Sequence, residues 1–241
     1  GCGKSVPFSE LRENTTIDLV EDIEKLRNYF KIDNWTLFGG SWGSTLALIY
    51  SIKYPSKIKS LILRGIFLCR SIELKWFYQY GASEIFPDEY EKYISIIPKK
   101  ERIDLIKSFY KLLTSKNEDL RKKAALAWTK WELSTSHLIK KEFEIETNTK
   151  NLFFDAFARI ECHYFINKIF LEDNFILKNI ERINKIPIKI VQGRYDVVCP
   201  LRSAWDLNKK LKESELFIVN NAGHSMSEEG ITQKLLEIIN K

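Results

Sequence analysis

The order of strand-like and helix-like segments constrains the fold of this chain more than any other feature of its sequence. Short apolar runs typical of buried strands occur at residues 35–38, 59–67, 188–191 and 216–219. Helical periodicity covers residues 16–30 and 45–54, and further helices begin near Pro200 and Glu228. Because strands that alternate with helices form parallel sheets, the sequence predicts an α/β protein.

A long block without strands interrupts this alternation. From about Cys69 to Ile186 the apolar residues recur only at helical spacing. Helices are expected near residues 88–97, 102–114, 118–135, 151–171 and 176–183. We therefore predict an α/β core, formed by residues 1–68 and 186–241, and an inserted all-helical cap domain at residues 69–185.

The charge and hydropathy of the chain exclude several classes of partner. Its 38 basic and 32 acidic residues give a net charge of +6, but the lysines are spread along the sequence. A nucleic-acid-binding surface would gather them in a stripe, so we expect no nucleic-acid partner. No apolar run approaches the ~20 residues that cross a bilayer. We expect a soluble cytoplasmic protein without a membrane partner, and a targeting segment before Gly1 would lie outside this sequence.

The cysteines indicate neither disulfide bonds nor a metal site. Cys2, Cys69, Cys162 and Cys199 form no C-x-x-C pair, and a chain of 241 residues does not need disulfide bonds for stability. We therefore expect reduced thiols, no metal and no cofactor.

Residues 39–43, Gly-Gly-Ser-Trp-Gly, match the motif G-x-S-x-G between a predicted strand and a predicted helix. This setting is the one that the motif requires, because its serine lies on a strained turn that exposes the hydroxyl. Gly39 and Gly43 are expected to leave room for the strand and the helix to approach each other. Ser41 is therefore the candidate nucleophile.

A serine hydroxyl needs a base to remove its proton. The sequence has three histidines, and His137 and His163 lie within the predicted helical insert. His224 instead follows the last predicted strand, at the same edge of the sheet as Ser41. His224 is therefore the candidate base.

The base needs an acidic partner that fixes its tautomer. Asp196 follows the strand at 188–191 and so lies at the same sheet edge, whereas Asp206 falls inside the next helix and is expected to face solvent. The order Ser41, Asp196, His224 is the order that α/β-hydrolases use. Asp196 is therefore the candidate acid.

Two further carboxylates, Glu132 and Glu161, lie among aromatic residues of the predicted cap. Burying a carboxylate is costly unless a cation accompanies it. Either each pairs with an internal basic residue such as Arg159, or the two together bind the ammonium group of a ligand. Spacing alone leaves both interpretations open.

Several segments of the sequence resemble proline iminopeptidases, a family of α/β-hydrolases with a cap. The matching segments are residues 1–5, 39–45, 63–67, 128–132, 158–165, 193–196 and 222–225. The resemblance implies a serine exopeptidase that releases proline from the N-terminus of small peptides. It implies the triad Ser41, Asp196 and His224, an oxyanion hole that includes the backbone N–H of Trp42, and recognition of the substrate amino group by Glu132 and Glu161. Aromatic residues that we expect to line the proline pocket are Trp76, Phe77 and Tyr78.

The sequence departs from the family pattern at two places. Gln192 stands where relatives often have histidine, a change that we expect to leave the triad untouched. The chain also starts after the segment where relatives carry the first strands and a His-Gly-Gly turn, so we expect these strands to be missing. One oxyanion donor would be lost with them, at a cost of about 2.7–4 kcal/mol. The alternative functions are another α/β-hydrolase, such as an esterase or a C–C bond hydrolase, or a truncated inactive form.

Overall fold

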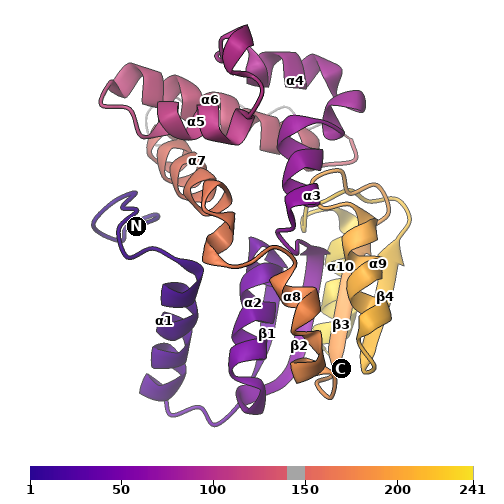
Figure 1. Ribbon diagram of the computed structural model, residues 1–241. Coiled ribbons are helices and arrows are strands. Elements are labelled where there is room, and N and C mark those ends of the chain that lie inside the picture. Colours follow the sequence, from indigo (N-terminus) through magenta and orange to yellow (C-terminus); the bar gives the residue numbers. More distant parts are fainter. Residues whose placement is uncertain (140–149, 241) are drawn as a thin grey trace. The chain divides into compact units, whose positions relative to one another are not determined.

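The computed structural model describes residues 1–139 and 150–240, which divide into two compact units (Figure 1). The sheet unit contains Thr16–Glu73, Ser136–Leu138 and Leu171–Lys241. The helical unit contains Gly1–Thr15, Leu74–Thr135 and Ile139–Phe170. Residues 1–15 thus group with the helical unit and residues 171–185 with the sheet unit, whereas the domain boundaries drawn from the sequence remain a prediction.

Four parallel strands form the sheet in the order in which they occur along the chain. They are β1 (Trp35–Ser41), β2 (Ile58–Ile66), β3 (Ile188–Gly193) and β4 (Ser214–Val219). Each corresponds to a predicted strand, so the prediction of a parallel α/β sheet is confirmed. Leu61, Leu63 and Ile190 are fully buried in the middle of the sheet, as expected for strands that are covered on both faces.

Helices cover both faces of this sheet (Figure 1). The helices α2 (Trp42–Lys53) and α9 (Leu201–Lys210) lie on one face, and α10 (Glu229–Ile239) lies on the other. Two further elements of the unit are α1 (Thr16–Tyr29) and α8 (Phe175–Lys178). Three apolar residues of α10 pack against Val191 and Ala222: Ile231, Leu235 and Ile238. The predicted helices around the sheet are therefore confirmed.

The helical unit is built around aromatic side chains. Its longer helices are α4 (Pro87–Ile94), α5 (Leu105–Leu113), α6 (Glu118–Thr135) and α7 (Lys150–Ile166), and the short helix α3 (Ser71–Leu74) precedes them. Tyr93 stacks on Phe109, with 4.5 Å between ring centroids, and on Trp131 at 5.6 Å. All three rings are buried. Within residues 69–139 and 150–185, the predicted helical insert is confirmed, although its last long helix ends at Ile166 because the backbone from Lys168 to Phe170 has positive φ angles.

Among the described residues, no helix is long and apolar enough to cross a membrane.

Candidate active site

The candidate nucleophile lies at the turn from β1 to α2. Ser41 has φ 56° and ψ −124°, a combination that is sterically unfavourable for a residue with a side chain. A Cβ atom on Gly39 would lie 2.4 Å from the carbonyl oxygen of Gly43, so position 39 has no room for a side chain. On Gly43, apart from its chain neighbours and the nearby backbone of α2, it would meet no described heavy atom within 4 Å. The steric demand predicted from the motif is thus correct for Gly39 and wrong for Gly43.

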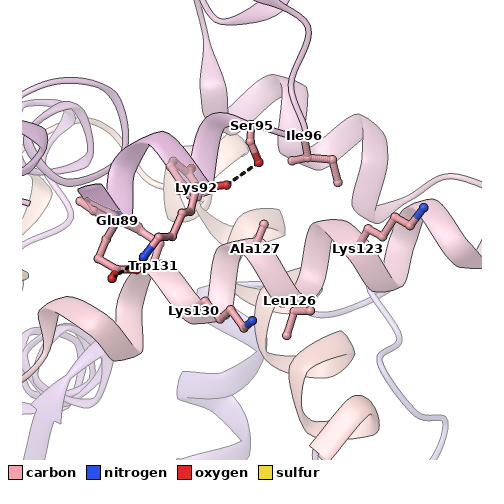
Figure 2. A pocket seen from close by; sticks show the side chains of 10 residues that line it. Glu89, Lys92, Ser95, Ile96, Lys123, Leu126, Ala127, Lys130 and Trp131 are labelled. Carbon is pink, nitrogen blue, oxygen red and sulfur yellow. Dashed lines mark hydrogen bonds and ion pairs between the residues drawn. The ribbon is translucent and has the colours of Figure 1, made fainter. Parts of the chain in front are cut away.

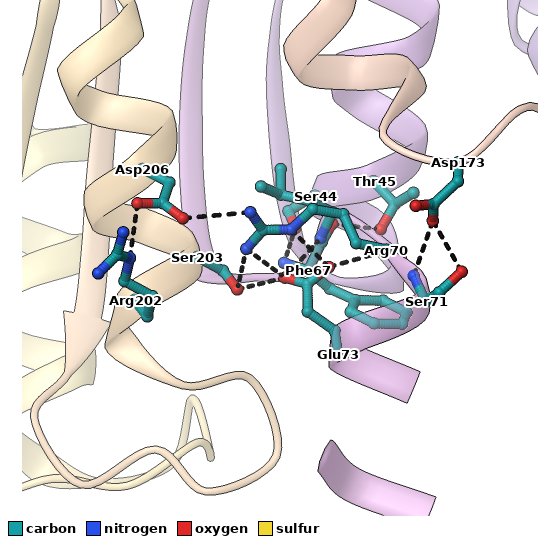
Figure 3. Close-up of polar contacts among 11 residues, drawn as sticks. Ser44, Thr45, Phe67, Arg70, Ser71, Glu73, Asp173, Arg202, Ser203 and Asp206 are labelled. Atoms are coloured by element: carbon teal, nitrogen blue, oxygen red, sulfur yellow. Dashed lines mark hydrogen bonds and ion pairs between the residues drawn. The ribbon is translucent and has the colours of Figure 1, made fainter. Parts of the chain in front are cut away.

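Two hydroxyl groups of α2 hold this turn against the chain that follows β2 (Figure 3). Ser44 donates a hydrogen bond to the carbonyl of Ser41 at 2.7 Å and accepts one from the N–H of Phe67 at 3.1 Å. Thr45 donates to the carbonyl of Phe67 at 2.6 Å. These bonds fix the position of the turn relative to the carboxyl end of β2.

The candidate base and acid form a buried pair. Nδ1 of His224 lies 2.8 Å from Oδ2 of Asp196, and the two residues are 9% and 4% exposed. The other carboxylate oxygen, Oδ1, accepts a hydrogen bond from the N–H of Cys199 at 2.7 Å. The backbone N–H groups of His224 and Ser225 both donate to the carbonyl of Ser136. Both loops are thereby anchored, and the sheet brings together residues that are 28 positions apart.

Cys199 connects this pair with the nucleophile. The Cys199 N–H binds Asp196 and its thiol lies near Ser41, and the described hydrogen bonds include none between Ser41 and His224. Burial raises the pKa of the Cys199 thiol well above its usual range, and the negative charges of Asp196 and Glu73 act in the same direction. The thiol is therefore neutral at physiological pH and does not compete with Ser41 as a nucleophile.

Two residues that contact the His224–Asp196 pair were given no role in the site by the sequence. Arg64 donates to the carbonyl of His224 at 3.0 Å, and the same nitrogen lies 3.4 Å from Nε2 of the imidazole. Gln192 donates from its side-chain nitrogen to Oδ2 of Asp196 at 2.8 Å, so the expectation that position 192 leaves the triad untouched is wrong. A signal existed, because Gln192 lies at the carboxyl end of a strand, four residues before Asp196.

Asp206, the rival acid, belongs to a different cluster (Figure 3). Its carboxylate accepts hydrogen bonds from Arg70 at 3.1 Å and from Arg202 at 2.7 Å. Arg70 also pairs with Glu73, which accepts a hydrogen bond from the Ser203 hydroxyl. The Asp206 side chain is 20% exposed, so the expectation that it faces solvent is wrong. This cluster joins α9 to the chain after β2.

The helical unit holds the two carboxylates of the cap. Glu161 accepts a hydrogen bond from the indole nitrogen of Trp128 at 2.8 Å, and the Tyr78 hydroxyl donates to Glu132. Burial and the neighbouring charge of Glu132 raise the pKa of Glu161 well above its usual range. Arg159 donates to the backbone carbonyls of Ser9 and Leu113, so it is not the partner of Glu161, and binding of a ligand's ammonium group by the two carboxylates stays a prediction.

Two aromatic residues of the segment predicted to line a proline pocket pack against tryptophans of α6. Phe77 and Tyr78 are buried, and the ring of Phe77 lies 5.4 Å from that of Trp131. Tyr78 stacks on Trp128 at 4.4 Å. Tyr78 therefore belongs to the group around the carboxylates, while the pocket role of Trp76 and Phe77 stays a prediction.

A groove of about 410 Å³ lies elsewhere in the helical unit, between α4 and α6 (Figure 2). Its floor is apolar and includes Trp131, and Lys123 and Lys130 lie along it. Its one carboxylate, from Glu89, is paired with Lys92 at 3.0 Å. This lining offers no nucleophile with a base, so the groove is not a candidate active site. In the part of the chain that the structure describes, no group of three or more His, Cys, Asp or Glu could hold a metal ion.

The fold and the strained serine beside a buried aspartate–histidine pair define a class of protein. Residues 1–231 match the α/β hydrolase fold family, and the chain belongs to that family. Two solved structures share the fold at low sequence identity. An α/β fold family hydrolase from Bacillus anthracis has a TM-score of 0.63 at 17% identity, and the match covers 100% of this chain and 78% of that one. An α/β hydrolase from a deep-sea metagenome has a TM-score of 0.56 at 20% identity, and the match covers 99% of this chain and 76% of that one.

Sequence relatives identify the branch of the family as the proline iminopeptidases. A probable proline iminopeptidase of Leptolyngbya boryana is 57% identical over 98% of this chain and 74% of its own length. The proline iminopeptidase of Arabidopsis thaliana is 50% identical over 98% of this chain and 63% of its own length. That of Neisseria gonorrhoeae is 43% identical over 99% of this chain and 76% of its own length. The chain therefore spans about two thirds to three quarters of the length of these relatives, and the resemblance seen in its motifs is confirmed.

Proposed function

We propose that this protein is a serine exopeptidase that releases proline from the N-terminus of small peptides. The names of its relatives support the substrate class. The observation that carries the chemistry is the buried 2.8 Å contact between His224 and Asp196, beside the strained Ser41 turn.

In the proposed reaction, the Ser41 hydroxyl turns toward His224 and attacks the carbonyl carbon of the N-terminal proline. His224 takes the hydroxyl proton, and the carboxylate of Asp196 stabilises the imidazolium that forms. The N–H of Trp42, which follows the nucleophile, donates to the oxyanion. His224 then gives the proton to the leaving amine, which departs and leaves a prolyl ester on Ser41. Water, deprotonated by His224, attacks this ester and releases proline.

We assign recognition of the substrate amino group to Glu132 and Glu161. A protonated N-terminal proline is a secondary ammonium with two N–H groups, so it can donate one hydrogen bond to each of two carboxylates. The raised pKa of Glu161 supports this role, because a pair that keeps a proton when empty can release it when a cation binds. An acylated N-terminus carries no charge and would leave two carboxylates in an apolar environment.

The cytoplasm is the proposed location. The four cysteines are free, and three of them are buried, which is in keeping with a reducing compartment. Cell fractionation with an antibody against the protein tests this proposal.

Activity with matched substrates tests the function. A proline arylamide is expected to be hydrolysed, the N-acetylated proline arylamide is expected to be resistant, and Ser41→Ala is expected to abolish turnover. Preferential hydrolysis of short acyl esters would favour an esterase instead. Equal hydrolysis of the two arylamides would contradict the roles of Glu132 and Glu161.

A further inference from the structure

We propose that Gln192 is a positioning residue of the triad, which holds the carboxylate of Asp196 in the plane that His224 requires. This inference rests on the proposed catalytic roles of Asp196 and His224. Position 192 has no assigned role in the triad.

Every polar group of the Gln192 side chain is used. The residue is fully buried, and its amide nitrogen donates to Oδ2 of Asp196 and to the carbonyl of Cys199, each at 2.8 Å. Its amide oxygen accepts from the N–H of Ile66 at 2.9 Å. Because an N–H only donates and a carbonyl only accepts, these neighbours fix which end of the amide faces Asp196. The side chain therefore has one orientation.

The contact restrains the carboxylate that faces the base. Oδ2 of Asp196 lies 2.8 Å both from the amide nitrogen of Gln192 and from Nδ1 of His224, and Oδ1 accepts from Cys199. With three donors around two oxygens, rotation of the carboxylate would break at least one bond in a buried setting. Leaving a buried polar group unpaired is costly, so Gln192 favours the productive orientation.

Gln192 also connects the acid to the nucleophile turn. The strands β2 and β3 are paired only as far as Arg64 and Val191. Beyond that point the Gln192 amide binds Ile66 in place of a backbone ladder. The next residue, Phe67, is bound by Ser44, which in turn binds the carbonyl of Ser41. Hydrogen bonds, joined by the peptide bond between Ile66 and Phe67, thus connect Ser41 to His224, and Gln192 is the link between the two strands.

The test compares Gln192→Met, which keeps the length of the side chain but removes its donor, with Gln192→His, which restores a donor. A surface substitution in α10, Gln233→Met, is the matched control. Two readouts are used with each folded variant. They are the rate constant for labelling of Ser41 by a fluorophosphonate probe, and the low-field proton resonance of the bond between His224 and Asp196.

Gln192→Met is expected to slow labelling by about 10- to 100-fold, because a displacement on the order of 1 Å at a catalytic group can cost that much. Its low-field resonance is expected to shift or broaden, whereas Gln192→His and Gln233→Met stay within about fivefold of the parent protein and keep the resonance. A folded Gln192→Met protein with the parent rate and resonance would overturn the proposal.

If Gln192→Met does not fold, Gln192→Glu decides. It keeps the shape and the oxygen that binds Ile66, and its second oxygen presents only an acceptor to Asp196 once the carboxyl group is ionised. Slow labelling and a shifted resonance are therefore expected at high pH, and parental values of both across the pH range would overturn the proposal. Neither readout involves proline. Labelling of Ser41 without hydrolysis of proline arylamides would therefore count against the proposed substrate and leave the Gln192 proposal standing.

Discussion

Gly65→Ala is the substitution whose effect can be worked out most directly from the structure. Gly65 has φ +52°, and a Cβ atom there would lie 2.9 Å from Cε1 and 3.1 Å from Nδ1 of His224. The methyl group would therefore press on the imidazole at the atom bonded to Asp196. Glycine at this position lets the backbone of β2 lie directly against the base.

Two costs are expected from this substitution. The left-handed backbone costs a residue with a Cβ about 1–2 kcal/mol, which lowers the melting temperature by about 2–8 °C for a protein of this size. Carbon atoms in ordinary contact are about 3.5–4.0 Å apart, so the imidazole of His224 must move by roughly 0.5–1 Å. A displacement of that order can reduce the reaction rate by up to about 100-fold.

The assay measures the fluorophosphonate labelling rate of Ser41 and the thermal unfolding midpoint of each protein. Gly3→Ala is the control, because Gly3 has φ +60° but a Cβ there would meet no described heavy atom within 4 Å. Gly3→Ala is expected to carry the backbone strain without the loss of labelling. If Gly65→Ala labels Ser41 as fast as Gly3→Ala does, the argument that Gly65 makes room for the base is wrong.

Three further substitutions test the site. Asp196→Asn is expected to lower kcat by about 10⁴-fold, as in other triads, because an amide cannot accept hydrogen bonds from Cys199, Gln192 and His224 together. An unchanged circular dichroism spectrum controls for folding, and retained turnover would contradict the role of Asp196. Glu161→Gln is expected to raise the melting temperature by a few degrees. Since its pKa is raised in the folded state, stability is lost as pH rises above about 4.5, so the gain should grow with pH, and a gain independent of pH would refute the reasoning. Tyr78→Phe keeps the stack on Trp128 but loses the bond to Glu132, so KM for proline arylamide should rise about tenfold with kcat retained; an unchanged KM would refute the role.

The sequence predicted the elements of the fold because each carries its own signal. Short apolar runs identified the four strands, and helical periodicity identified the helical block. The glycine at position 39 marked the turn of Ser41. Chain order then brought His224 and Asp196 to one sheet edge. These inferences depend on local patterns and on the general rule that parallel strands share a carboxyl edge.

The remaining features of the site depend on side-chain contacts between distant segments. The amide of Gln192 reaches Ile66 across 126 positions, and Arg64 reaches His224 across 160. No periodicity predicts such a contact. The sequence also left the partner of Glu161 open, because the bonds of Arg159 to backbone carbonyls join segments that are distant along the chain.

The chain order of the triad has a consequence during synthesis on the ribosome. Ser41 precedes the loop with His224 by 183 residues, and that loop follows β4, the last of the four described strands. At about 5–20 residues per second, roughly 10–40 s separate translation of the nucleophile from that of its base. Throughout this interval the growing polypeptide has a serine without a proton acceptor, so the nascent protein cannot attack peptides near it until the sheet is complete.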